Sequence, residues 1–162
     1  MELRDKAAIV GVGYTEQQGT VPGRTAMSLA IEACKDAIQD AGLKKEDIDG
    51  LLLQPHPGAQ THSYDLAARL GMDLRFTANE DAMGASAAFI THSAALAVIS
   101  GMANYVLCVY ASTSQSNPGM GPGGGGPGGP GRIAGPSMYG SFGAAMQYAL
   151  AARRGMHEFG TG

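Results

Sequence analysis

The sequence is short of several residue types, and each shortage excludes a class of protein. It contains no tryptophan, only two cysteines and 6% aromatic residues in 162. Two cysteines without metal-ligand spacing argue against a disulfide scaffold or a zinc module. The 11 lysines and arginines are outnumbered by 14 acidic residues, and a protein that binds the phosphate backbone of nucleic acids would show clustered basic residues instead.

Charge is scarce as well, and it is unevenly distributed. Charged residues make up 15% of the chain, against about a quarter in ordinary soluble domains. None occurs between Asp81 and Arg132, which suggests that protein rather than water covers much of this stretch. The charged N-terminal sequence, Met1 to Lys6, lacks the apolar run of a signal peptide, so we expect a cytoplasmic protein.

The uncharged residues 82–112 are apolar and small, and their length would suffice for a membrane span. Ser86, His92 and many alanines make such a span unfavourable, because an intramembrane histidine needs a partner. The alternative is a helix over about 86–100 that is buried on nearly all sides inside protein. We therefore predict a central buried helix between layers, no membrane span, and a hydrogen-bonded His92 in the core.

The rest of the pattern predicts an α/β fold with a mainly parallel sheet. Buried strands alternate with helices, and right-handed crossovers then place neighbouring strands side by side. We expect residues 1–113 to form the core, and residues 114–162 to form a Gly/Pro-rich loop that leads into a further region. The expected strands are 7–13, 51–54, 74–78 and 105–110, and the other expected helices are 25–41, 64–70 and 142–159.

Two glycine-rich segments could bind phosphate, but neither has the required pattern. Gly11-Val12-Gly13 follows an expected strand, yet Glu16 stands where a dinucleotide-binding fingerprint has its third glycine. These glycines are better explained by close packing of the backbone. The run at 119–131 has no lysine of a phosphate-binding loop, and we interpret it as a surface loop.

The histidines and cysteines point to neither a metal nor an activated thiol. No histidine pairs with another ligand residue at metal spacing, so we expect no metal. Cys34 and Cys108 lie in an expected helix and an expected strand and are interpreted as buried structural residues. His56 follows a strand, where α/β proteins place their sites, but lacks a partner. The four histidines are His56, His62, His92 and His157.

The start of the buried helix, Gly84-Ala85-Ser86, is the most informative position. The free backbone N–H groups and the dipole of a helix N-terminus favour a nucleophile or a negative charge there. Ser86 could serve a serine hydrolase, but the nucleophile elbow requires glycine where this chain has Ala88. We favour Ser86 as the N-cap of the helix.

Several segments together resemble the N-terminal half of the thiolase superfamily. They are residues 7–16, the helix end at 37–43 followed by Asp47-Ile48-Asp49-Gly50, and residues 94–101 with Val106-Leu107. The segment 139–161 resembles the sterol-carrier-type thiolases and the steroid side-chain-cleaving aldolases. This resemblance implies a five-layer αβαβα fold, of which only the N-terminal half is present, and a site for acyl-CoA thioesters.

The resemblance also assigns site residues. Gly84 matches the position of the nucleophilic cysteine of thiolases, and a glycine cannot form an acyl-enzyme. The aldolase branch lacks this cysteine too, and it performs retro-aldol cleavage of a β-hydroxyacyl-CoA. We therefore predict this reaction, with no catalytic residue assigned, no cofactor beyond the CoA thioester substrate, and no metal. The expected substrate-binding residues are Met83, Gly84, Ser86, Tyr139 and Phe142.

Two other functions stay open at this point. The chain could belong to an acyl-CoA acyltransferase whose nucleophile lies elsewhere, or it could be a non-catalytic thiolase-like subunit of a hetero-oligomer. Relatives carry a second, similar half, so this chain alone is expected to be inactive. The resemblance further implies a homodimer and a possible small partner protein with an OB-fold and a zinc ribbon.

Overall fold

The computed structural model describes residues 4–55, 61–113, 116 and 144–161. It divides into two units, Met1–Ser116 and Asn117–Gly162, and each is described by itself. Tyr139, Phe142 and the Gly/Pro-rich run at 119–131 lie outside the described residues.

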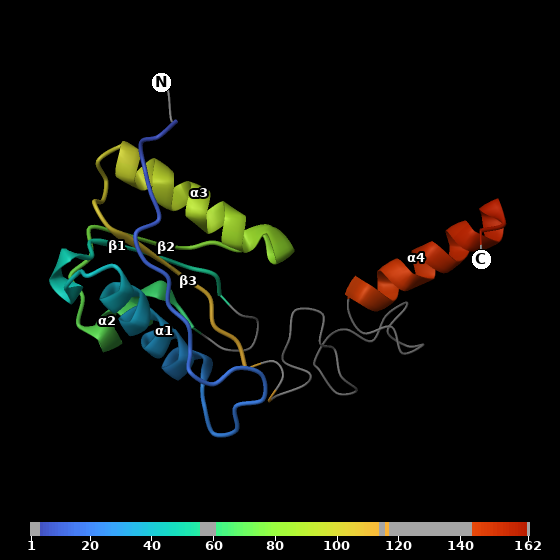
Figure 1. Cartoon of the computed structure of the whole chain (residues 1–162), viewed down its shortest axis with the longest axis horizontal. Coiled ribbons are helices and arrows are strands. Elements are labelled where there is room, and N and C mark those ends of the chain that lie inside the picture. The colour runs from blue at the N-terminus through green and yellow to red at the C-terminus, as the bar shows by residue number, and fades with distance from the viewer. Residues whose placement is uncertain (1–3, 56–60, 114–115, 117–143, 162) are drawn as a thin grey trace. The chain divides into compact units, whose positions relative to one another are not determined.

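A three-stranded parallel sheet forms the centre of the first unit (Figure 1). The strands are β1 (Gly50–Leu53), β2 (Phe76–Asn79) and β3 (Val106–Val109), in the order β2-β1-β3. Gly50 stands opposite Phe76 on one side and Val106 on the other. All four residues of β1 are buried, which explains their unbroken apolar sequence, since a central parallel strand is covered on both faces.

Helices cover both faces of this sheet (Figure 1). Helices α1 (Ala26–Asp40) and α2 (Ser63–Leu70) pack on one face, where Leu51 and Leu53 meet Cys34 and Leu66. Helix α3 (Ser86–Ile99) packs on the other face, where Leu52 meets Ile90 and Ala94. The alternation of β1 side chains between the two clusters follows from the two-residue period of a strand.

The helices of the first unit start and stop at the residues that the sequence indicated. The hydroxyl of Thr25 caps α1 by accepting from the Ser28 N–H at 3.1 Å. Gly42 follows α1 and Gly71 caps α2, each with a positive φ that favours glycine. Two short 3-10 turns, η1 (Lys45–Asp47) and η2 (Met83–Ala85), complete the elements of this unit.

The predicted strand at 7–13 was wrong. Among the residues that the structure describes, this segment pairs with no strand, and Ile9 and Val10 are 76% and 57% exposed. Its backbone instead lies so close to α1 that a Cβ on Gly13 would stand 2.1 Å from the Ala33 carbonyl oxygen. The expectation that Gly11 and Gly13 serve close packing is thus confirmed, but the packing partner is a helix.

Carboxylates of α1 take the place of a partner strand for this segment. The N–H groups of Val12, Tyr14 and Glu16 donate to Asp40, Asp36 and Glu32 at 2.9, 2.9 and 2.7 Å. Alternate residues of an extended chain advance by roughly 6.6 Å, and residues four apart on a helix advance by about 6 Å, so each N–H group lies opposite a carboxylate. The sequence pattern signalled an extended segment but not what would satisfy its donors.

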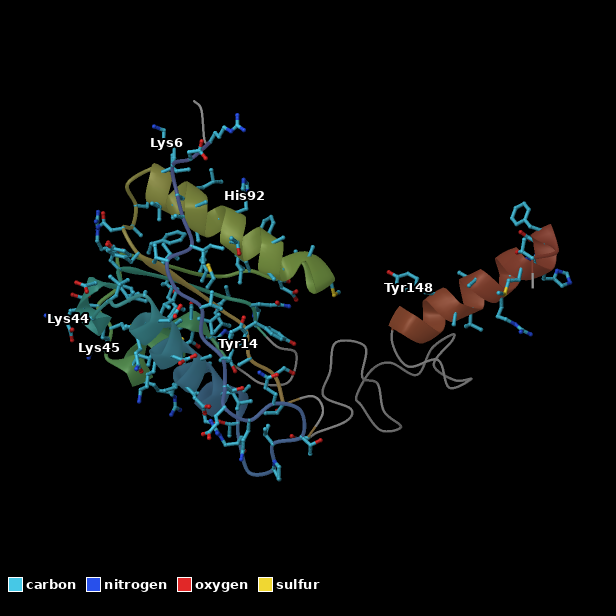
Figure 2. The ribbon with its side chains drawn as sticks, viewed as in Figure 1. Lys6, Tyr14, Lys44, Lys45, His92 and Tyr148 are labelled. Atoms are coloured by element: carbon cyan, nitrogen blue, oxygen red, sulfur yellow. The ribbon has the colours of Figure 1, made fainter. Side chains whose placement is uncertain are left out.

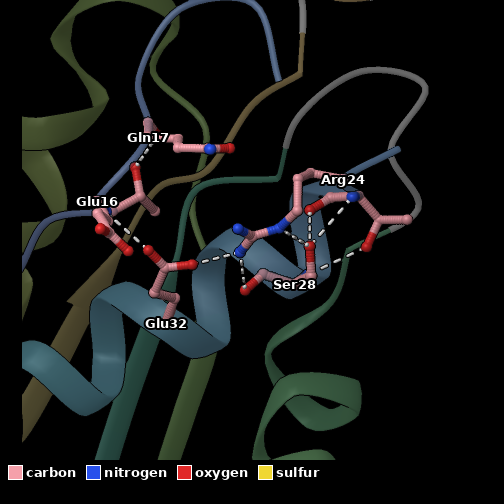
Figure 3. Close-up of polar contacts among 7 residues, drawn as sticks. Glu16, Gln17, Arg24, Ser28 and Glu32 are labelled. Atoms are coloured by element: carbon pink, nitrogen blue, oxygen red, sulfur yellow. Dashed lines mark hydrogen bonds and ion pairs between the residues drawn. The ribbon is translucent and has the colours of Figure 1, made fainter. Parts of the chain in front are cut away.

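Figure 3 shows the contacts of Glu32, which accepts the hydrogen bond from the Glu16 N–H. Glu32 forms an ion pair with Arg24, whose Nε also donates to the Ser28 hydroxyl at 3.1 Å. The hydrogen bond from the Arg24 side chain and that from the Glu16 N–H hold the pKa of Glu32 below its usual value. The residues before α1 are therefore fastened to the first turns of that helix.

Helix α3 has the predicted position, but its predicted burial on nearly all sides was wrong for the described residues. Only Ser86, Ile90, Ala94 and Ala97 are buried. His92, predicted in the core, is exposed on the side of α3 away from the sheet (Figure 2). A helix that is apolar on all sides is normally buried on all sides. The described residues bury only the side of α3 that faces the sheet.

The second unit contains helix α4 (Ala144–Phe159), close to the predicted 142–159. Its side chains from Tyr148 onward are mostly exposed. Across the described residues of both units, we find no helix with the length and hydrophobicity that crossing a membrane requires.

Candidate functional site at the turn before α3

The candidate site lies where β2 passes into α3. β2 ends at Asn79, the turn η2 follows at Met83–Ala85, and α3 begins at Ser86. In parallel α/β sheets, ligands bind outside the carboxyl ends of the strands. The first N–H groups of a helix also lack partners within the helix. The turn thus brings Met83 and Gly84 to the end of the sheet where chemistry is usually found.

Met83 has an unusual backbone conformation. Its φ is +54°, in the left-handed region that residues with a side chain rarely adopt, and its side chain is 72% exposed. Such a conformation costs roughly 1–3 kcal/mol and persists only where surrounding contacts enforce it. The contacts around Met83 therefore need an explanation.

Asp81 and Ser86 supply those contacts. The Met83 N–H donates to Asp81 Oδ1 at 2.8 Å, and the Ala82 N–H donates to the Ser86 hydroxyl at 2.8 Å. The same hydroxyl donates to the Met83 carbonyl oxygen at 2.8 Å and lies 3.3 Å from Asp81 Oδ1. Hydrogen bonds with the side chains before and after the turn, those of Asp81 and Ser86, therefore hold its conformation.

The prediction that Ser86 is the N-cap of the buried helix was wrong. Ser86 is the first residue of α3 rather than its N-cap, which is Ala85 without a side-chain bond. With 1% of its surface exposed, its hydroxyl is committed to the turn. This geometry argues against Ser86 as a hydrolase nucleophile, because a nucleophile must be reachable by substrate.

Gly84 is not required by the local backbone or by packing within the first unit. It is not among the glycines with positive φ, and no atom of the described residues lies within 4 Å of the position that a Cβ would occupy. Gly11 and Gly13, by contrast, are needed for close approach to α1. The open side of Gly84 therefore offers space for a ligand.

The two cysteines are poor nucleophiles. Burial raises the pKa of Cys34 to about 12, and Cys34 is buried as predicted. Cys108 is exposed, so the prediction that it is buried was wrong. Desolvation of its thiol, together with the negative charge of Glu80, still raises the pKa of Cys108 to about 11. Both thiols stay protonated near neutral pH.

The histidines do not assemble into a site. His62 stacks on Tyr64 with ring centroids 5.2 Å apart, His92 lies on the outer side of α3, and His157 is in α4 of the second unit. His56 lies outside the described residues. No group of three histidine, cysteine or carboxylate side chains that could hold a metal occurs within residues 4–55, 61–113, 116 and 144–161.

Sequence reasoning missed Asp81 and Glu80. The bond that Asp81 accepts from the N–H two residues later is the usual one for aspartate in turns, so an aspartate between a strand and a helix could have signalled it. Glu80, just after β2, has a buried Oε2 without a hydrogen-bond partner. Nothing in the sequence indicated that this oxygen would be enclosed.

A hollow of about 610 Å³ lies elsewhere in the first unit. Residues 6–13 line it together with side chains of α1, α3 and β3, most of them apolar. The residues of the turn, 81–86, do not line it, so it does not extend the space beside Gly84.

Comparison with known proteins identifies relatives with named activities. The chain is 35% identical over 116 residues to a steroid side-chain-cleaving aldolase of Thermomonospora curvata. It is 36% identical over 114 residues to the 17-hydroxy-3-oxo-4-pregnene-20-carboxyl-CoA lyase of Mycobacterium tuberculosis. Each match covers 70% of this chain, and the chain spans only 29% of the length of each relative. No family model matches.

Solved structures show the same relationship. The Ltp2-ChsH2(DUF35) aldolase superposes on 95% of this chain and 38% of that chain, with a TM-score of 0.69 and 31% identity. A monomeric SCP2-thiolase-like protein of Mycobacterium smegmatis covers 62% of this chain and 22% of that chain, with a TM-score of 0.51 and 25% identity. A priming β-ketosynthase, 20% identical at a TM-score of 0.53, shares the fold alone over 62% of this chain and 40% of that one.

Proposed function

We propose, from the premise that the chain is a thiolase-like homologue of the steroid side-chain-cleaving aldolases, that it is part of a carbon–carbon lyase. Its substrate would be a β-hydroxyacyl-CoA thioester. The observation that carries this proposal is Gly84, which stands open at the start of α3 where a thiolase carries its cysteine. A glycine has no atom that could accept an acyl group. Cleavage without an acyl-enzyme is therefore the reaction that the turn supports.

The reaction would proceed as a retro-aldol cleavage. A base removes the proton of the β-hydroxyl group, and the bond between the α and β carbons breaks. The hydroxyl carbon becomes a ketone or an aldehyde, and the electron pair moves to the α carbon as an enolate of the thioester. Protonation of this enolate releases the shorter acyl-CoA. We assign the base to none of the described residues.

The turn suits the enolate because of where its donors lie. The Ser86 N–H already donates to the Met83 carbonyl oxygen, so the proposed donors are the N–H groups that follow it in the first turn of α3, just after Gly84. Donors already in place for a developing negative charge lower the barrier without reorganisation. Met83 and Gly84 would contact the thioester. Ser86, which is buried, would hold the turn in place through its hydrogen bonds and would not contact the substrate. Tyr139 and Phe142 stay proposed pocket residues.

A steroid-like side chain is the proposed acyl part, on the strength of the relatives' names. The experiment incubates the complete protein, in whatever polypeptide or assembly carries this chain, with a steroid β-hydroxyacyl-CoA. The expected products are a steroid ketone and a short acyl-CoA, formed without added CoA. If the protein leaves this substrate intact and instead cleaves a β-ketoacyl-CoA with free CoA into two acyl-CoA products, the enzyme is a thiolase and the lyase proposal is wrong.

The acyltransferase alternative has weaker support. It needs a nucleophile, and the pKa values of about 12 and 11 leave both thiols of the chain unreactive near neutral pH. A nucleophile for this alternative would therefore have to come from outside this chain or from an oxygen group.

A second protein component is the proposed partner. The solved neighbour with a TM-score of 0.69, the Ltp2-ChsH2(DUF35) aldolase, is named after two proteins, which supports an assembly of this kind. The partner expected from the resemblance is a small OB-fold, zinc-ribbon protein, and a second copy of the protein itself is the other proposed contact. Size-exclusion chromatography with light scattering of the co-expressed proteins tests both. A monomer that remains fully active would contradict both contacts.

A further inference from the structure

We propose that Asp81 and Ser86 are positioning residues that hold the Met83–Gly84 turn in the shape the lyase reaction requires. This inference rests on the proposed function, and it assigns roles to two side chains that need not touch the substrate. Its basis is the convergence of their hydrogen bonds on one strained residue.

The first step concerns strain. Met83 is one of only two residues other than glycine with a positive φ among the described residues, the other being Asp5 near the N-terminus. Asp5 forms a surface ion pair with Arg4, whose side chain is 82% exposed. Met83, in contrast, lies at the end of the sheet, directly before the open glycine. Backbone strain kept at such a place indicates a functional constraint.

The second step concerns what enforces the strain. The Met83 N–H donates to Asp81, and the Met83 carbonyl oxygen accepts from the Ser86 hydroxyl. The same carbonyl oxygen also accepts from the Ser86 backbone N–H and, at 3.5 Å, from Gln54 Nε2. The N–H of Met83 therefore depends on Asp81, while its carbonyl oxygen has further donors. Ser86 additionally accepts from the N–H of Ala82. Because these bonds begin on both sides of Gly84 in the sequence, they fix the direction in which its open side faces.

The third step separates the two residues chemically. Ser86 is buried, so its hydroxyl can serve only the turn. Asp81 is exposed, and its carboxylate could in principle act through its charge as well as through its hydrogen bond. Asn has the same acceptor oxygen without the charge, and thus Asp81→Asn distinguishes the two roles.

The test measures kcat and KM of the complete protein and of Asp81→Ala, Asp81→Asn and Ser86→Ala. We expect Asp81→Ala and Ser86→Ala to lower kcat about 10- to 100-fold with KM changed less than about threefold, because small misplacement of reacting groups is costly. Asp81→Asn should recover most of the lost rate. Asp73→Ala, which removes another exposed carboxylate, is the matched control and should behave as the parent protein.

An activity-independent measurement accompanies the kinetics. Amide hydrogen exchange of Met83 should be about tenfold faster in Asp81→Ala than in the parent, and near the parent rate in Asp81→Asn, since only the latter keeps the acceptor. This readout also covers the case in which Ser86→Ala fails to fold.

The outcomes separate the two proposals. A parent protein without lyase activity overturns the proposed function, while the exchange rates still show whether the two side chains hold the turn. An active parent with equally active Asp81→Ala overturns the positioning role. An Asp81→Asn variant as slow as Asp81→Ala overturns it too, because the charge would then matter rather than the hydrogen bond.

Discussion

The two faces of the sheet differ in how many buried residues pack against them. On the face of α1 and α2, nine buried residues form one cluster, and the outer side of α1 carries charges that suit water. On the face of α3, the buried cluster of the described residues has only Leu52, Ile90 and Ala94, and the helix leaves Phe89 and Leu96 exposed. The difference teaches that α1 forms an outer layer, whereas α3 has the composition of an inner one.

The largest effect is expected from a charge at Leu96, an exposed apolar residue of α3. Leu96→Glu in the complete protein should abolish soluble folded protein, because burying an unpaired carboxylate costs several kcal/mol. Soluble yield and a thermal melt measure this. Lys35→Glu on the exposed side of α1 is the control and should change stability by less than about 0.5 kcal/mol. Two equally stable variants would show that α3 also faces water in the complete protein.

Two neighbouring leucines of β1 compare the faces directly. Leu51 and Leu52 are both 0% exposed, but they point to opposite faces. We expect Leu51→Ala to cost about 4 kcal/mol and Leu52→Ala about 3 kcal/mol, because the larger cluster leaves the larger cavity. Urea denaturation gives both values. A larger cost at Leu52 would contradict this ranking, because it would show that the sizes of the two clusters do not set the cost of the cavity.

Two glycines contrast packing with function. Gly13→Ala should destabilise the protein by about 1–3 kcal/mol, since the new methyl group would stand 2.1 Å from the Ala33 carbonyl oxygen. Gly84→Ala should change stability by less than about 0.5 kcal/mol, yet it should slow the lyase reaction, because its methyl group fills the open side of the turn. Melting curves and initial rates distinguish these outcomes. A marked loss of stability at position 84 would mean that packing, not substrate, requires this glycine.

The smallest effect on stability is expected from Asp49, which directly precedes β1 at the end of the sheet opposite the turn. Burial tends to raise the pKa of Asp49, but the N–H groups of Tyr105 and Asn104, bound at 2.9 and 2.7 Å, outweigh it and hold this pKa below its usual value. The resulting stability is complete above the unfolded pKa of about 3.9 and is lost as the pH falls through the lower folded pKa.

Denaturation midpoints between pH 6 and pH 2 measure this contribution, with Asp49→Ala as the comparison. The parent should lose more stability than the variant over the acid part of that range. The exposed Asp73→Ala should follow the parent curve. Parallel curves for the parent and Asp49→Ala would contradict the role of this carboxylate.

The residues by themselves determined the order of helices and strands in the core, the parallel sheet and the thiolase-like resemblance. Period and composition record these features locally: Leu51-Leu52-Leu53 marks a strand covered on both faces, and Gly42 and Gly71 mark helix ends. The same patterns led to wrong predictions for residues 7–13 and for His92. An apolar or uncharged segment indicates that it favours burial, but its sequence does not indicate which part of the protein buries it.

Only the tertiary structure decided the details of the candidate site. The tie between Asp81, Met83 and Ser86 depends on how β2 ends and α3 begins, and the open side of Gly84 depends on which atoms are absent around it. Hydrogen bonds between side chain and backbone form at fixed distances in space, and sequence spacing alone does not set those distances. The sequence therefore predicted the position of α3, but it did not predict the conformation of the turn before it.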